Sequence, residues 1–112
     1  MFSKVDDIGV KIGKNTVVIL VVGKILLSSK EQKTLIESFG SDIHVIYLRS
    51  MDYLSVKLVV AKLRSKGIEP KIILPFDLNL IIYILTFSEE VYVFRNGKLM
   101  KVLNLVVKME EM

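Results

Sequence analysis

The chain has 112 residues, of which 52% are hydrophobic and 25% charged, and its formal net charge is +4. This length suits a single domain over 1–112, and the apolar content excludes an intrinsically disordered chain. The absence of cysteine excludes disulfides, thiolate metal ligands and a cysteine nucleophile. No apolar run reaches the roughly 18 residues of a membrane span and no targeting segment is evident, so a cytoplasmic protein without a membrane partner is expected.

The first part of the chain predicts two strands joined by a turn. Residues 8–12 alternate between isoleucine or valine and glycine or lysine, which is the period of a strand. The Gly-Lys-Asn sequence at 13–15 is typical of a turn. The mostly β-branched run over about 16–22 predicts a strand buried on both faces, in the middle of a parallel sheet. Together the two strands form a predicted antiparallel hairpin.

A helix is predicted next. Either Ser28 with Glu31 or Ser29 with Gln32 fits a capping box, and Gly40 is typical of the residue that follows a helix. The apolar stripe of this helix consists of Leu35, Ile36 and Phe39. One face of the helix is therefore expected to pack on a sheet.

The clearest helix lies between two predicted strands, over about 43–48 and 71–74. It begins with Asp52 as its N-cap and ends at Gly67. Its broad predicted apolar face consists of Leu54, Val56, Leu58, Val59, Val60, Ala61 and Leu63. Its polar face is basic and consists of Lys57, Lys62, Arg64 and Lys66. Such a face is usually solvated, but it is also a candidate contact for a nucleic-acid backbone.

Residues 75–87 raise a question of burial. After Pro75 and a cap at Asp77, residues 78–87 predict a helix that crosses over the sheet, with a strand as the alternative. Eight large apolar side chains surround its axis, and packing on one sheet face leaves about half of them exposed. We expect a second copy of the chain to cover that side, or the C-terminal hairpin to fold over it. The predicted dimer interface consists of Leu80, Ile81, Tyr83, Ile84 and Phe87.

The end of the chain predicts a β-hairpin. Asn96 and Gly97 tolerate the positive φ angles of a type I′ turn between strands over about 91–95 and 98–107. Strands that alternate with helices predict parallel pairing and right-handed crossovers. The predicted fold is therefore an α/β, Rossmann-like three-layer fold. Its mixed sheet has parallel core strands over about 16–22, 43–48 and 71–74, and the antiparallel C-terminal hairpin.

Candidate ligand residues lie in the loops after the three core strands, because open α/β sheets bind ligands at the carboxyl ends of their strands. They are Gly23, Lys24, Ser28, Ser29, Arg49, Ser50, Asp52, Asp77 and Asn79. Cations and hydroxyls beside helix N-termini suit a phosphate-bearing ligand such as a nucleotide. Helix capping alone also accounts for the serines and aspartates.

No cofactor and no metal are expected, because the Gly-rich phosphate-binding motifs are absent and His44, the single histidine, lies inside an apolar strand. The alternative is that Asp52 and Asp77 meet as a carboxylate pair that holds Mg²⁺.

Three functions from different classes remain open. The first is a binding or regulatory module that acts as a homodimer, since no catalytic constellation is present. The second function follows from a resemblance. In its order of elements the chain is similar to CARF-type domains, which bind cyclic oligoadenylates and sometimes cleave them. This resemblance implies a sensor, or a metal-independent phosphodiesterase acting on a cyclic oligonucleotide, with cations and hydroxyls from Lys24, Ser28, Arg49 and Ser50. The third is an accessory nucleic-acid-binding protein that uses the basic helix.

Overall fold

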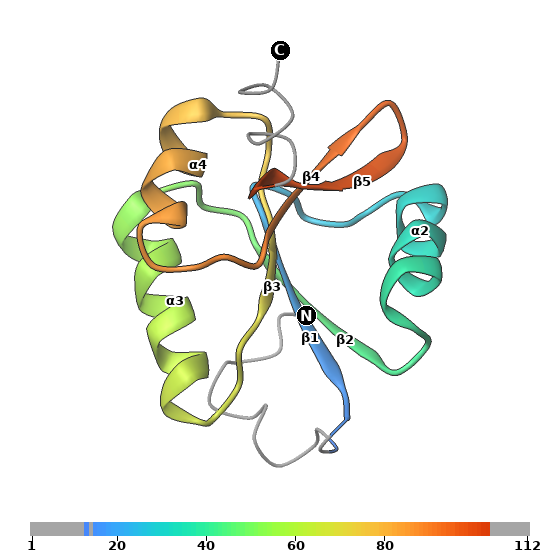
Figure 1. Ribbon diagram of the computed structural model, residues 1–112, viewed down its shortest axis with the longest axis horizontal. Coiled ribbons are helices and arrows are strands. Elements are labelled where there is room, and N and C mark those ends of the chain that lie inside the picture. Colours follow the sequence, from blue (N-terminus) through green and yellow to red (C-terminus); the bar gives the residue numbers. More distant parts are fainter. Residues whose placement is uncertain (1–12, 14, 104–112) are drawn as a thin grey trace.

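The structure is a computed structural model that describes residues 13 and 15–103. Its sheet is formed by β1 (Val17–Val22), β2 (Ile43–Leu48), β3 (Lys71–Ile73), β4 (Val91–Arg95) and β5 (Lys98–Lys101). The strand order is β2-β1-β3-β4-β5, with β1 to β4 parallel and β5 antiparallel to β4. The helices are α2 (Ser29–Phe39), α3 (Tyr53–Ser65) and α4 (Leu78–Leu85). Figure 1 shows α2 on one face of the sheet and α3 with α4 on the other, so the predicted three-layer α/β fold is confirmed.

β1 lies at the centre of the sheet. It pairs with β2 along its whole length and with β3 over Ile19–Val21. Leu20 packs toward α3 and α4, whereas Ile19 and Val21 pack toward α2, so burial on both faces is confirmed. The predicted hairpin with residues 8–12 is wrong in its pairing, because β1 already has neighbours on both sides. Residues 8–12 themselves lie outside the described residues.

Capping bonds set where α2 begins and where α3 ends. The backbone N–H of Glu31 donates to Ser28 Oγ at 3.1 Å, and the backbone N–H of Ser28 donates to Glu31 Oε1 at 3.0 Å. This reciprocal pair decides between the two predicted capping boxes in favour of Ser28. At the end of α3, Gly67 has a φ of 78°, and Ile68 N–H donates to Leu63 O at 3.0 Å. That bond is one of the two that define a Schellman motif.

The apolar face of α3 is narrower than its sequence predicts. The buried side chains are Val56, Val60 and Leu63. Leu54 and Leu58 are 60% and 59% exposed, and Ala61 is exposed as well. A helix packed on one sheet face buries one side, and these three residues lie on the opposite side. Ile36 on α2 is exposed for the same reason, so both predicted faces contained residues that the structure leaves in solvent.

Residues 78–85 form the predicted helix, which ends two residues earlier than expected. Leu80, Ile81 and Ile84 are buried within the protein's own core, where a second chain cannot reach them. The predicted dimer interface is therefore wrong at these three residues. Among the eight large apolar side chains, Leu78 and Ile82 are exposed, which is fewer than the expected half.

α3, rather than the C-terminal hairpin, flanks α4 and covers its remaining aromatic side chains. The rings of Tyr53 and Tyr83 stack with centroids 4.8 Å apart. Arg64 Nη2 donates to the backbone carbonyl of Phe87 at 2.6 Å, and its guanidinium lies 5.9 Å from the centre of the Phe87 ring. Tyr83 and Phe87, the other two predicted interface residues, are thus half-buried against α3.

The C-terminal hairpin has the predicted turn. Asn96 and Gly97 have φ angles of 53° and 76°, as a type I′ turn requires. β5 ends at Lys101, and residues 102–103 are helical, so the predicted strand is too long at this point. Val102 is buried in the core on the face covered by α3 and α4. Residues 104–107 lie outside the described residues.

Glu90 joins three strands at the amino edge of the parallel sheet. Its Oε2 accepts hydrogen bonds from Lys71 Nζ and from the Tyr92 hydroxyl, both at 2.9 Å, and Lys101 Nζ lies 3.7 Å from its Oε1. The hydrogen bond from Lys71 lowers the pKa of Glu90, and this outweighs the opposite effect of burial. Burial, together with the bond to Glu90, raises the pKa of Tyr92 to about 12.

Replacing Glu90 with glutamine is expected to lower the free energy of unfolding at neutral pH by about 1 kcal/mol. Because the pKa of Glu90 is lower in the folded state, its contribution is present above the unfolded pKa and is lost as the pH falls through the folded pKa. Urea unfolding of both proteins at neutral pH and near pH 3 measures this difference. Glu89→Gln, at the exposed neighbouring position, is the control and should show no such pH dependence. A difference between wild type and Glu90→Gln that persists at low pH would contradict the assignment.

Candidate functional site

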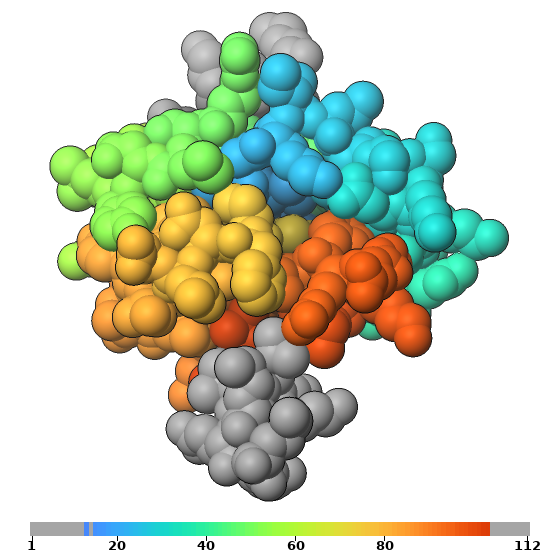
Figure 2. Space-filling view, turned by 90° about the horizontal axis from the view of Figure 1, so that it is seen from above, coloured from blue at the N-terminus to red at the C-terminus, as the bar shows by residue number. Residues whose placement is uncertain are grey.

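Two loops leave the carboxyl edge of the sheet in opposite directions, between β1 and β3. The loop after β1 leads to α2 on one face, and the loop after β3 leads to α4 on the other. Such a switch point leaves a crevice, which is where doubly wound proteins bind ligands. Figure 2 looks onto this edge and shows the segments after β1 (blue), after β3 (yellow) and in the hairpin (red) meeting around a hollow.

A pocket of about 140 Å³ occupies this crevice. Its lining consists of Val21, Val22, Gly23, Lys24, Leu27, Ile73, Leu74, Pro75, Phe76 and Phe94. Lys24 is the only charged side chain in this lining. A cavity of about 150 Å³ holds one benzene ring, so this pocket suits a single apolar side chain. Pockets for larger ligands span roughly 300–1,000 Å³, so this pocket is too small to enclose a whole nucleotide.

Gly23 shapes the entrance of the pocket where β1 ends. Its φ is 79°, which side chains disfavour, and a Cβ here would lie 3.1 Å from Cγ and Sδ of Met51. Its backbone N–H donates to Leu48 O at 2.7 Å, which holds the turn against β2. A larger residue would therefore strain the backbone and push Met51 away from the pocket entrance.

Lys24, the charged residue of the pocket, is already paired. Its Nζ donates to Oε2 of Glu31 at 2.8 Å. Burial raises the pKa of Glu31, but hydrogen bonds from Lys24 and Ser28 outweigh burial and hold the pKa below its ordinary value. The charge of Lys24 is thus balanced locally, and Ser28 is occupied by the capping box. Ser29, the first residue of α2, is exposed.

The predicted ligand residues after β2 and β3 make local bonds instead. Ser50 Oγ accepts from the backbone N–H of Asp52 at 3.1 Å, and Asp52 Oδ2 accepts from the backbone N–H of Ser55 at 3.3 Å. Asp77 Oδ1 accepts from the backbone N–H of Leu80 at 3.2 Å. Each aspartate therefore caps its own helix. Within the described part of the chain, no cluster of three or more carboxylate or histidine side chains could hold a metal ion.

Carboxylates at all three helix starts decide the electrostatics of this edge. Glu31, Asp52 and Asp77 accept bonds from the N–H groups that an anion would need, and they place negative charge beside them. Arg49 has no hydrogen bond or ion pair with any described residue, and Asn79 is exposed. Of the nine predicted ligand residues, Gly23 and Lys24 line the pocket. This arrangement disfavours a phosphate group in the crevice.

Four large apolar side chains in the loops that border the crevice were not among the predicted site residues. They are Ile25, Leu26, Met51 and Phe76, and all four are exposed. Phe76 lines the pocket, Met51 lies against Gly23, and Ile25 and Leu26 follow Lys24 in the chain. We call these four side chains the apolar rim. The signal in the sequence was a run of three aliphatic residues, Ile25 to Leu27, inside a short loop between a strand and the helix cap Ser28, of which only Leu27 is buried.

No protein-family model, curated protein or solved structure matches the chain. Among the described residues, no helix has the length and apolar character needed to cross a bilayer.

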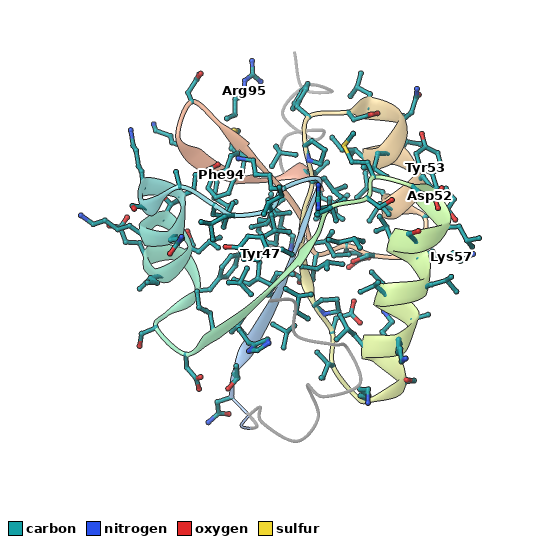
Figure 3. The ribbon with its side chains drawn as sticks, turned by 180° about the vertical axis from the view of Figure 1, so that it is seen from behind. Tyr47, Asp52, Tyr53, Lys57, Phe94 and Arg95 are labelled. Atoms are coloured by element: carbon teal, nitrogen blue, oxygen red, sulfur yellow. The ribbon has the colours of Figure 1, made fainter. Side chains whose placement is uncertain are left out.

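Within the basic face of α3, Arg64 is bound to other parts of the protein, whereas Lys57 has no such bond in the described part of the chain. Arg64 makes two hydrogen bonds to the carboxylate of Glu69, at 2.8 and 2.7 Å, besides its bond to Phe87. Lys57 is exposed and points away from the body of the protein (Figure 3).

On β2, His44 has a buried Nε2 without a hydrogen-bond partner among the described residues. Its position inside the sheet layer separates it from the crevice at the carboxyl edge.

Proposed function

We propose that this protein is a binding module that acts as a homodimer, and that the apolar rim forms the contact between the two copies. The observation that carries the proposal is an exposed pair of apolar side chains in a loop whose flanking residues, Lys24 and Leu27, line a pocket of matching size. Ile25 and Leu26 are 63% and 68% exposed, and they directly follow the residues that line a pocket of about 140 Å³. In a two-fold dimer, each copy inserts its own loop into the pocket of the other.

Size and chemistry support an aliphatic side chain as the occupant. The pocket volume is close to that of one ring or one branched side chain. Its walls are mostly aliphatic residues with Phe76 and Phe94, and Lys24 is the one charged residue among them. Full burial of a leucine or isoleucine side chain contributes about 1.5–3 kcal/mol. An anchor that fills a pocket at the centre of an apolar contact is the typical position of a residue that dominates binding.

The sensor or phosphodiesterase alternative draws less support from the same edge. That alternative needs free cations and hydroxyls near one another, from Lys24, Ser28, Arg49 and Ser50. Lys24 is paired with Glu31, and the hydroxyls of Ser28 and Ser50 accept backbone hydrogen bonds, so Arg49 is the one member of this set whose side chain has no partner among the described residues. A binding role through apolar contact, by contrast, depends on side chains that are exposed in the structure, such as Ile25 and Leu26.

Sedimentation velocity over a micromolar concentration range tests the proposal. The wild-type chain is expected to sediment as a dimer. Leu26→Glu removes the anchor from both copies of the dimer, so two losses of about 2 kcal/mol each are expected to raise the dissociation constant by roughly 1,000-fold. Leu58→Glu makes the same change at a similarly exposed leucine on the outer side of α3 and should leave the dimer intact.

Two results would contradict the proposal. One is a wild-type protein that remains monomeric throughout the concentration range. The other is a dimer that survives Leu26→Glu but dissociates with Leu58→Glu, which would place the contact on α3. Circular dichroism of both variants shows that each remains folded, as substitutions at exposed positions should.

A further inference from the structure

Three cations gather at the tip of the β4–β5 hairpin. Arg95 and Lys98 lie directly opposite each other across the two-residue turn. Lys30, on the first turn of α2, reaches the same turn, since its Nζ lies 3.5 Å from where a Cβ on Gly97 would stand. All three residues are exposed. We call Lys30, Arg95 and Lys98 the basic corner.

This arrangement costs stability within the protein itself. Like charges directly opposite each other on neighbouring strands are destabilising. None of the three cations has a hydrogen bond or an ion pair with another residue in the described part of the chain. The nearest carboxylate in sequence, that of Glu31, is bound to Lys24 and to the Ser28 backbone. The basic corner therefore concentrates positive charge that no described residue balances.

The base of the hairpin packs against the core, so the position of the tip is set by the fold. Phe94 and Leu99 are opposite each other and pack into the core between the sheet and α2. Asn96 and Gly97 close the hairpin with the type I′ geometry that suits the twist of two strands. Figure 3 shows Arg95 pointing away from the body at the end of the hairpin, whereas Phe94 lies within it.

We propose that the basic corner binds the phosphate backbone of duplex DNA, with the hairpin tip entering the major groove. Lysine and arginine side chains that neutralise phosphates supply the sequence-independent part of DNA binding. The major groove of B-form DNA is about 12 Å wide and admits a two-stranded β-ribbon, whereas the deep, narrow major groove of duplex RNA does not. The formal net charge of +4 favours the approach of a polyanion. This site is separate from the apolar rim and does not rest on the proposed dimer.

The basic corner also changes where a nucleic acid is expected to bind. The sequence pointed to the charged face of α3, but Arg64 on that face is bound to Glu69 and Phe87. On the hairpin, by contrast, Arg95 and Lys98 flank the turn and are exposed to solvent without a side-chain partner among the described residues. The two locations differ in their mutational signatures, so one experiment separates them.

Fluorescence anisotropy with a labelled DNA duplex of mixed sequence, measured over a series of salt concentrations, tests the proposal. Three phosphate contacts predict a slope of about −2.7 in a plot of log K against log salt concentration, since each contact contributes about −0.9. Replacing Lys30, Arg95 or Lys98 singly with alanine should reduce the slope by about 0.9 each. Lys57→Ala, at an exposed cation on α3, is the matched control and should leave the slope unchanged.

Lys98→Glu provides a second readout that a purely structural role would not produce. It places a carboxylate opposite Arg95, so the unfolding temperature is expected to rise while DNA affinity falls. All measurements are repeated with Leu26→Glu, so that a failure of the dimer and a failure of DNA binding are told apart. Absence of salt-dependent binding, an unchanged slope in the alanine variants, or tighter binding of single-stranded DNA or duplex RNA would each overturn the proposal.

Discussion

Replacing Leu63 with alanine is expected to lower the free energy of unfolding by about 2–5 kcal/mol, the range for deleting a large aliphatic side chain from a core. Leu63 is 0% exposed and packs between α3 and the sheet. The same replacement at Leu58, which is 59% exposed on the same helix, is expected to change stability by less than about 0.5 kcal/mol. A whole domain is stable by about 5–15 kcal/mol, so the first change removes a large share of the total.

Urea unfolding followed by circular dichroism measures both values, with the slope of the transition as a check that the denatured state is unchanged. The two leucines are five residues apart in one helix, so helix propensity does not account for a difference between them. If Leu58→Ala cost as much as Leu63→Ala, the outer side of α3 would have to be covered in solution. Repeating the measurement at lower protein concentration would then show whether a second copy covers it, because such cover is lost on dilution.

Replacing Arg64 with alanine is expected to lower the free energy of unfolding by about 1–2 kcal/mol. The side chain joins the end of α3 to Glu69 through two hydrogen bonds and to the end of α4 through the Phe87 carbonyl. Hydrogen bonds to charged groups contribute more than neutral ones, but partial exposure of this pair to solvent reduces the gain. The loss also leaves the Phe87 carbonyl without its partner.

Thermal and urea unfolding of Arg64→Ala, Arg64→Lys and Lys57→Ala test this expectation. Arg64→Lys keeps the charge but loses the planar two-pronged contact, so it should recover less than half of the loss. Lys57→Ala removes an exposed cation from the same helix and should change stability by less than about 0.5 kcal/mol. Equal losses from Arg64→Ala and Lys57→Ala would mean that net charge, rather than the specific bonds of Arg64, determines the effect.

Local signals in the sequence were sufficient to predict the individual helices, strands and turns. β2 and β4 have the predicted ends, because apolar, β-branched runs bounded by turns allow little else. Ser28, Asp52 and Asp77 cap the three helices as expected, since a side-chain oxygen bonds an N–H only three residues away. The type I′ turn at Asn96 and Gly97 follows from their tolerance of positive φ.

Burial was harder to predict than the elements. The sequence of α3 carries apolar residues around most of its circumference, and periodicity does not say which part faces the sheet. Leu54 and Leu58 were expected in the core but lie in solvent, because α3 shares one sheet face with α4 and packs through its opposite side. In the same way, α4 needed less cover from outside than its composition suggested, since Tyr53 and Arg64 of α3 cover Tyr83 and Phe87.

One part of the candidate site could be predicted from the sequence, and another part depended on the tertiary structure. The rule that ligands bind at strand carboxyl ends led to Gly23 and Lys24, which line the pocket. The same rule gave no reason to choose between the three loops, because the choice depends on which strands are neighbours. Pairing of β1 with β3 places the switch point between their two loops and brings Phe76 and Phe94 to one pocket. Ile25 and Leu26 became candidates for a contact only because the structure shows that Lys24 and Leu27, on either side of them in the chain, line this pocket.

By itself, the sequence determined the succession of strands and helices along the chain, their caps and turns, and the three-layer α/β class. These features depend on interactions within a few residues and on the alternation of apolar side chains. Only the tertiary structure decided which strands are neighbours in the sheet, the buried side of each helix and the partners of each charge. These depend on contacts between residues far apart in the chain, such as Arg64 with Phe87 and Lys30 with the turn at Gly97. The apolar rim and the basic corner are both products of such long-range contacts, so they became visible only in the folded chain.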